Sequence, residues 1–235
     1  MQEQLQNSNT SHLIPLIDNQ NNDQCLPMPV WQHIPAMTIN NVHPRSSEHH
    51  PKTIVKLAAD QYALHMRFEV EDRYVCCRHL QRQGPVCQDS CVEAFLKPLP
   101  DKGYFNFEIN IAGVIHTSYI ADHTKVPTGF KDRTMLRDVE LDLIQIQADG
   151  HGRIDPEITE PLHWGITCCI PLSIFEQYVG PIQVSSKTQW QGNFYKCADH
   201  SSHPHWLSWQ PVGEVLGFHK PECFGRLCFD SSPQI

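Results

Sequence analysis

The sequence predicts an all-β protein, an antiparallel β-sandwich with at most one or two short helices. Apolar and polar residues alternate with a period of two along several stretches, and Gly, Pro and Asp separate those stretches. Only one stretch has the pattern of a helix. Short strands between turn residues are typical of two packed antiparallel sheets, and 235 residues is an ordinary length for one such domain.

Two stretches show the alternation most clearly. In "YALHMRFEVED" (62–72), the apolar set Tyr62, Leu64, Met66, Phe68 and Val70 alternates with His65, Arg67 and Glu69. In "YFNFEINIAG" (104–113), the apolar set Phe105, Phe107, Ile109 and Ile111 alternates with Asn106, Glu108 and Asn110. Each stretch is expected to be a strand with one face in the core. The second strand then presents two amides and a carboxylate on its other face.

Two further stretches are expected to be strands with particular features. "DSCVEAFLKP" (89–98) alternates Val92, Ala94 and Leu96 with Cys91, Glu93 and Phe95. Since both sets are largely apolar, we expect both faces of this strand to be covered. "DVELDLIQIQ" (138–147) alternates and then slips in phase at Ile144, which predicts a strand with a bulge or a kink.

The remaining predicted elements are two strands and one helix, and Pro171 separates the first strand from the helix. "HWGITCCIPL" (163–172) is expected to be a strand that its proline stops. "LSIFEQYVG" (172–180) is the one stretch with a helical pattern, with Ser173 as a possible N-cap and Gly180 as its end. "GRLCF" (225–229) is expected to be the last strand of the series.

The periodic pattern divides the chain into a lead-in and one domain. Residues 1–25 are rich in Gln and Asn without periodicity, and residues 40–52 have the composition of a connector. We therefore expect residues 1–50 to be a polar, partly flexible N-terminal lead-in, and residues 51–235 to form a single sandwich domain.

Charge and hydropathy exclude several classes of partner. The net charge is -8 and the Lys and Arg residues are scattered, which argues against a nucleic-acid-binding protein. No stretch approaches the roughly 20 apolar residues that span a bilayer, so no membrane partner is expected. The N-terminus lacks a basic segment followed by an apolar run, so we see no signal peptide and expect a cytoplasmic location by default.

The ten cysteines are expected to be reduced thiols, because the sequence shows no secretion signal. Cys168 falls in phase with the apolar residues of its strand, as a small buried hydrophobic residue does. The paired CxxC patterns of structural zinc sites are absent from the sequence. A structural zinc site is therefore not the favoured interpretation.

The sequence contains none of the nucleotide-binding, metalloprotease, serine-hydrolase or EF-hand motifs, and no enzyme activity is predicted. The candidate functional carboxylates are Asp89, Glu93 and Glu108. Paired carboxylates can perform glycosidase acid–base chemistry, hydrogen-bond a ligand or bind calcium. The pattern favours the two binding roles.

The stretch "NFYKCADHSSHPHWLSWQPV" (193–212) concentrates imidazole and indole groups. Its histidines His200, His203 and His205 are weak candidates for metal ligands, against a loop in which they serve hydrogen bonding. Trp206 and Trp209 do not alternate strictly, so at least one is expected in the core. An exposed ring of this pair would stack on the C–H face of a sugar, beside strand-borne Glu and Asn.

Six of these stretches, in order between residues 60 and 230, together resemble the family 9 carbohydrate-binding modules, and more closely their bacterial "family 9-like" relatives. The pieces that carry the resemblance are "YALHMRFEVED", "DSCVEAFLKP", "GYFNFEINIAG", the "W…IPLSIF" unit from Trp164 to Phe175, "GNFYKCADHSSHPHWLSWQPV" and "FHKPECFGRLCF".

The resemblance implies a jelly-roll-like sandwich that binds mono- or oligosaccharides between aromatic side chains, often with structural calcium, in the context of carbohydrate catabolism. By position, Glu93 would accept hydrogen bonds from sugar hydroxyls beside Asn110, and Glu108 stands where characterised modules can carry arginine. The sandwiching tryptophans fall near Val86-Cys87 and at Phe218 here, so one wall is missing or is rebuilt from Trp206 or Trp209. The expected ligand-binding residues are Glu93, Glu108, Asn110, Trp206, Trp209, Phe218 and His219.

Two alternatives to sugar binding stay open. One is a sandwich whose ligand site has decayed, since the two tryptophans are lost. The other is a metal- or haem-binding module, because the chain is rich in His, Cys and Met. His65 and Met66 point to opposite faces of their strand, so they cannot both be axial ligands of one haem.

Overall fold

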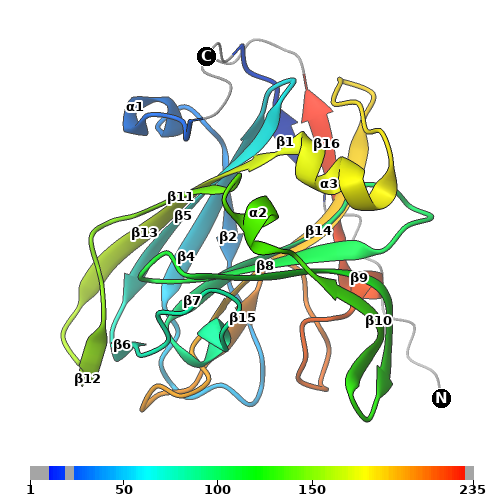
Figure 1. The fold of residues 1–235 in the computed structure, drawn as a ribbon. Coiled ribbons are helices and arrows are strands. Elements are labelled where there is room, and N and C mark those ends of the chain that lie inside the picture. The colour runs from blue at the N-terminus through cyan, green and yellow to red at the C-terminus, as the bar shows by residue number, and fades with distance from the viewer. Residues whose placement is uncertain (1–10, 19–23, 231–235) are drawn as a thin grey trace.

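The computed structural model describes residues 11–18 and 24–230, and within them it has two large sheets, of nine and five strands, and a two-stranded pair. Figure 1 shows the two large sheets as layers with short helices at their margins. Apart from the parallel pair β1–β16, the strands of both sheets pair antiparallel. The predicted antiparallel β-sandwich is confirmed.

We call the nine-stranded sheet the large sheet. Across it lie β1 (Ser11–Pro15), β16 (Gly225–Asp230), β14 (Gln189–Cys197), β7 (Cys91–Lys97), β8 (Tyr104–Asn110), β9 (Ile115–Val126) and β10 (Gly129–Met135), while β15 (Trp206–Ser208) pairs with β14 and with β3 (Asn41–Val42).

We call the five-stranded sheet the small sheet. Its strands, in order, are β11 (Gln145–Ala148), β13 (Leu162–Pro171), β5 (Ala63–Asp72), β4 (Lys52–Ala59) and β2 (Ala36–Ile39). The separate pair is β12 (Ile154–Ile158) with β6 (Val75–Cys77). The helices are α1 (Met28–Trp31), α2 (Asp138–Leu141), α3 (Leu172–Val179) and the 3₁₀ turns η1 (Val86–Gln88) and η2 (Pro221–Cys223). None of the helices among the described residues is long and apolar enough to cross a bilayer.

The main core lies between the two sheets, and the two strands with the clearest alternation fill it as predicted. The core residues of β5 and β8 are Leu64, Met66, Phe68, Val70, Phe105, Phe107 and Ile109. Tyr62 is the exception, because it lies just before β5 and is 42% exposed. Cys168 is fully buried in the same core, as its phase predicts.

Strand β7 is covered on both faces, which confirms the prediction from its two apolar sets. Val92, Ala94 and Leu96 belong to the main core, whereas Cys91 and Phe95 belong to a second cluster on the other face. That second cluster includes Val212, Phe218 and Phe224. The chain that follows β15 therefore covers the outer face of the large sheet and closes a second layer of packing over it.

The prediction of one strand over residues 138–147 is wrong, because helix α2 occupies its first half and β11 begins only at Gln145. The backbone N–H of Arg137 donates to the Glu140 carboxylate at 2.6 Å, and the Leu141 N–H donates to the Arg137 carbonyl at 3.0 Å. These local hydrogen bonds stabilise a helical turn. The apparent slip at Ile144 is the end of that turn.

Helix α3 confirms the predicted helix, and Gly180 ends it with a φ of 86°, a conformation that favours glycine. The predicted N-cap is wrong. Pro171 occupies that position and no side chain caps the helix. The backbone N–H of Leu172 instead donates to the carbonyl of Tyr62 at 2.7 Å. A neighbouring segment therefore accepts a hydrogen bond from one N–H group of the first helical turn.

The N-terminal region expected to be a lead-in contributes strands to both sheets. β1 pairs in parallel with β16, and β2 forms an edge of the small sheet. The Trp31 side chain of α1 is buried in a small cluster with Ala58. Residues 1–10 and 19–23 of the Gln/Asn-rich stretch lie outside the described residues.

Candidate functional site

A pocket of about 220 Å³ opens on the outer face of the large sheet, and we call it the large-sheet pocket. Strands β7, β8 and β14 form its floor, and the segments around residues 199–206 and 216–219 form its walls. The lining residues are Cys87, Glu93, Phe95, Glu108, Cys197, Asp199, Trp206, Leu216, Gly217, Phe218 and His219.

Strand pairing brings the two glutamates together. Glu93 of β7 is the register partner of Glu108 on β8 and of Tyr195 on β14. Directly opposite residues in an antiparallel pair project to the same face of the sheet. The core takes the alternate residues of both strands, so both carboxyl groups face the pocket. The polar strand face noted in the sequence is therefore part of the pocket floor.

Both glutamates are buried acids. Burial, and then the charge of Glu108, raises the pKa of Glu93 well above its ordinary range. Burial also raises the pKa of Glu108, although its carboxylate accepts a hydrogen bond from Asn106 Nδ2 at 2.7 Å. A carboxyl group of this kind can donate when protonated and accept when ionised. The floor can therefore match both the donor and the acceptor of a hydroxyl group.

Asp199 adds a third carboxyl group to the pocket. Its Oδ1 accepts a hydrogen bond from Trp206 Nε1 at 2.7 Å, which fixes the indole ring at the pocket wall. Burial raises the pKa of Asp199 despite this hydrogen bond. Trp206 is only partly buried, so its ring remains available to a ligand.

Phe218 and His219 form another part of the pocket wall. The Phe218 ring stacks on Tyr195 with a centroid distance of 4.0 Å, and Tyr195 Oη donates to the Phe218 carbonyl at 3.1 Å. The imidazole of His219 forms a 2.9 Å hydrogen bond with Tyr104 Oη, and burial lowers the pKa of His219 to about 3. Both rings are therefore held by the sheet, and His219 is neutral.

Five of the seven residues expected to bind the ligand line this pocket: Glu93, Glu108, Trp206, Phe218 and His219. The other two do not. Trp209 is 8% exposed and packs in the main core. Asn110 is fully buried, and its Nδ2 donates to Asp89 Oδ2 and to the His79 carbonyl, so it organises a loop beside the site.

The sequence does not predict five of the lining residues. Asp199 and Cys197 lie within the stretch that is rich in histidine and tryptophan, and Leu216 and Gly217 lie in the loop after it. The sequence pattern places Phe95 on a covered strand face and does not mark it as a pocket residue. The period-two pattern of β7 could have placed Phe95 beside Glu93, but no pattern places the loop residues. Cys87, noted near a lost tryptophan position, does line the pocket.

The three histidines that were weak metal candidates have separate environments. His205 is buried, with Nε2 2.8 Å from Lys196 Nζ and Nδ1 2.9 Å from the His203 carbonyl. The His203 ring stacks on Tyr74 at 3.6 Å, and His200 is exposed. The structure therefore does not bring the three imidazoles together around one point.

The residues considered for haem also lie apart. His65 Nε2 is 3.0 Å from Asp60 Oδ2, on one face of β5. Met66 belongs to the main core on the other face. This arrangement matches the opposite orientations that the alternation predicts.

Among the residues that the structure describes, no three Asp, Glu or His side chains come together as candidate ligands for the calcium that the family resemblance suggests. The one group of three closely spaced His, Cys, Asp or Glu donors found there contains two thiols. Calcium prefers six to eight oxygen ligands. The oxygens of Asp89 accept from the backbone N–H groups of Arg78 and His79 at 2.8 and 2.9 Å, in addition to Asn110.

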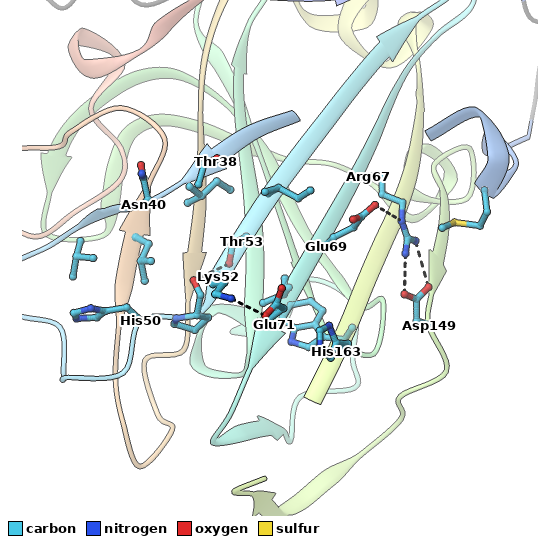
Figure 2. A pocket seen from close by; sticks show the side chains of 18 residues that line it. Thr38, Asn40, His50, Lys52, Thr53, Arg67, Glu69, Glu71, Asp149 and His163 are labelled. Carbon is cyan, nitrogen blue, oxygen red and sulfur yellow. Dashed lines mark hydrogen bonds and ion pairs between the residues drawn. The ribbon is translucent and has the colours of Figure 1, made fainter. Parts of the chain in front are cut away.

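A larger cavity, of about 640 Å³, lies beside the polar faces of β4 and β5, and Figure 2 shows the side chains that line it. Its charged side chains pair with one another. Arg67 Nη2 lies 3.0 Å from Asp149 Oδ2, and Lys52 Nζ lies 3.2 Å from Glu71 Oε2. Trp164, the one tryptophan among its lining residues, is 3% exposed. This small-sheet cavity therefore offers paired charges without an exposed indole or phenyl ring.

Comparisons with solved structures find the same architecture. A "putative carbohydrate-binding protein" from Bacteroides uniformis matches with a TM-score of 0.82 and 25% identity, over 94% of this chain and 99% of that one. A family 9 carbohydrate-binding module from Caldicellulosiruptor kristjanssonii, solved with cellotriose, matches with a TM-score of 0.60 and 13% identity, over 95% of each chain. The corresponding complex with glucose gives a TM-score of 0.60 and 12% identity, over 95% of this chain and 97% of that one.

The comparison with curated proteins returns no match. The family model described as "Carbohydrate-binding family 9" matches residues 27–229, which is most of the 235-residue sequence. The match extends from α1 to β16 and includes all of the lining of the large-sheet pocket. The chain therefore belongs to carbohydrate-binding family 9.

Proposed function

We propose that this protein binds a mono- or oligosaccharide terminus in the large-sheet pocket, without catalysis. The observation that carries the proposal is the combination of three carboxyl groups with the rings of Trp206 and Phe218 around one small cavity. Membership of the family supports it, and so does the solved relative described as a complex with glucose.

The size and chemistry of the pocket suit one sugar ring. Its volume of about 220 Å³ lies below the roughly 300–1,000 Å³ of sites for drug-sized molecules. A sugar ring has C–H faces that pack on aromatic rings and hydroxyl groups that need donors and acceptors at the rim. Phe218 and Trp206 supply the first, and Glu93 and Asp199 supply the second.

This chain lacks the two tryptophans that sandwich the sugar in the family, so we propose that other aromatic side chains contact the sugar ring. Cys87 lines the pocket near one of those positions, where it offers little stacking surface. Trp206 lines the pocket from a different segment and is held by Asp199. We infer that Trp206 and Phe218 are the two aromatic contacts of the bound ring.

Isothermal titration calorimetry against glucose, cellobiose and xylo-oligosaccharides tests the proposal. The wild-type protein should bind at least one of them. Phe218→Ala should weaken that binding by roughly 1–3 kcal/mol, by analogy with the stacking of bases on aromatic side chains. Glu93→Gln should weaken it by about 0.5–1.5 kcal/mol, because the amide cannot exchange the donor and acceptor roles of the buried carboxyl group.

The matched control is Glu69→Gln, which alters a carboxylate in the small-sheet cavity. It should leave the affinity unchanged. Incubation with the bound oligosaccharide should release no new reducing ends, which separates binding from hydrolysis. If none of the glycans in a broad panel binds, the proposal is contradicted and a sandwich whose ligand site has decayed is favoured.

A further inference from the structure

Two thiols and a carboxylate converge at the floor of the large-sheet pocket. Cys91 of β7 and Cys197 of β14 are register partners on adjacent strands, and Glu93 follows two residues after Cys91 on the same face. The two Sγ atoms and a carboxylate oxygen of Glu93 all lie within 4.8 Å of one another, and all three residues are buried. Cys197 Sγ lies 3.1 Å from Glu93 Oε1.

These three donors are close enough to form a tetrahedral metal site after small side-chain adjustments. Zinc binds thiolate sulfur at about 2.3 Å and carboxylate oxygen at about 2.0–2.2 Å, so neighbouring ligands lie about 3.5–3.8 Å apart. Side-chain adjustments of less than about 1 Å would bring the three donors to that spacing. Two thiolates exclude calcium and magnesium as the preferred ions, and the carboxylate favours zinc over copper(I).

The surrounding charge favours a cation. Glu93, Glu108 and Asp199 all line the pocket, and its lining residues include no Lys or Arg. Lys196, next to Cys197 in sequence, points to the opposite face of β14, where its Nζ lies 3.2 Å from Asp72 Oδ2. A divalent cation at the floor would compensate the buried carboxylates, which no cationic side chain does from within the pocket.

We propose that Cys91, Cys197 and Glu93 form a binding site for a thiophilic divalent metal ion, zinc in the first place. Glu93 and Cys197 line the pocket, so water or a ligand oxygen from the pocket would supply the fourth ligand. Metal binding releases the protons of the two thiols, and the proton of the Glu93 carboxyl group when it is protonated, to solvent. The carboxylate can ligate through Oε1 and still accept a hydroxyl through Oε2. The site does not depend on the proposed sugar binding.

Cobalt(II) substitution tests the site directly. Reduced protein, freed of metal by a chelator, is titrated with cobalt(II) and then with zinc. We expect one equivalent of cobalt(II) with a thiolate charge-transfer band and the visible d–d bands of tetrahedral coordination, which zinc then bleaches. Cys91→Ala and Cys197→Ala should each lose most of the charge-transfer intensity. Glu93→Gln should keep that band and bind about tenfold or more weakly.

The matched control is Cys168→Ala, because Cys168 is as fully buried as Cys91 but lies in the small sheet. Its cobalt(II) spectrum should equal that of the wild type. A second measurement needs no substitution: zinc should protect Cys91 and Cys197 of the wild-type protein from alkylation, as mapped by peptide mass spectrometry. Absence of a tetrahedral thiolate spectrum would overturn the proposal. An unchanged spectrum in both cysteine variants, or a Cys91–Cys197 disulfide that resists reductant, would also overturn it.

Discussion

Glu93 is the residue on which both the proposed sugar binding and the proposed metal binding depend most. Glu93 as a residue is only 3% exposed. It lies opposite Glu108 on the neighbouring strand and beside the thiol of Cys197. Such a group costs free energy when ionised and little when protonated. The same property lets it exchange protons and hydrogen bonds with a ligand that enters the pocket.

The raised pKa of Glu93 predicts a pH dependence of stability. The folded chain binds this proton more tightly than the unfolded chain, for which the ordinary pKa is 4.5. The stabilisation by the protonated carboxyl is therefore complete below about pH 4.5 and is lost as the pH rises through the folded pKa. Because Glu93 and Glu108 interact, they titrate as a pair.

We expect Glu93→Gln to gain stability relative to the wild type as the pH rises above 4.5. The difference should grow by up to about 1.4 kcal/mol per pH unit until the folded pKa is passed. Urea unfolding of both proteins across a pH series, in the presence of a chelator, measures it. A difference that does not change with pH would show that Glu93 titrates as an ordinary surface carboxyl.

At the scale of the elements, the indole ring of Trp209 packs against the start of β16. Gly225 is the register partner of Gly192 on β14. A Cβ atom on Gly225 would lie 2.5 Å from Cζ3 and 2.6 Å from Cη2 of Trp209. The glycine thus makes room for Trp209, which explains why this tryptophan is in the core and not at the pocket.

Gly225→Ala should therefore lower the free energy of unfolding by about 1–3 kcal/mol, the usual cost of overpacking. Chemical denaturation monitored by tryptophan fluorescence measures this change. Gly152→Ala is the control, because a Cβ atom there would meet nothing within 4 Å, and its effect should stay within about 0.5 kcal/mol. Equal stability of both variants would contradict the packing described for Trp209.

The sequence predicts the strands of this protein better than its loops. Alternation located β5, β7, β8 and β13 because each buries one residue in two against the same core. It failed over residues 138–147, where local hydrogen bonds of Arg137 and Glu140 stabilise a helical turn. The alternation in β7 and in β8 places Glu93 and Glu108 on the outer face of their strands. The pairing of these two strands then brings the two carboxyl groups together. The position of Asp199 depends on how a loop crosses the sheet, which no local pattern encodes.

At the scale of the molecule, a buried polar contact joins the two sheets. Lys196 of β14 lies 3.2 Å from Asp72 of β5, and Asp72 also accepts a hydrogen bond from Trp164 Nε1 at 3.3 Å. Burial alone would raise the pKa of Asp72, but the charge of Lys196 and a hydrogen bond from His49 lower it instead. His205 completes this group through Lys196. Two of the chain's histidines thus support the sandwich beneath the pocket.

Among the cavities that the described residues form, one of about 640 Å³ lies on the small sheet and one of about 220 Å³ on the large sheet, and we assign the sugar to the smaller of these two. The small-sheet cavity is larger, but its charges already pair with one another. The large-sheet pocket combines aromatic walls with carboxyl groups that lack a cation among the lining residues. The location of a bound sugar therefore distinguishes the account from its main competitor.

The most direct measurement is a crystal structure of the protein with the tightest-binding glycan from the calorimetric panel. We expect a terminal sugar ring in the large-sheet pocket, packed against Phe218 and Trp206, with a hydroxyl group within hydrogen-bond distance of Glu93. A sugar bound in the small-sheet cavity beside Arg67 and Glu69 would contradict it.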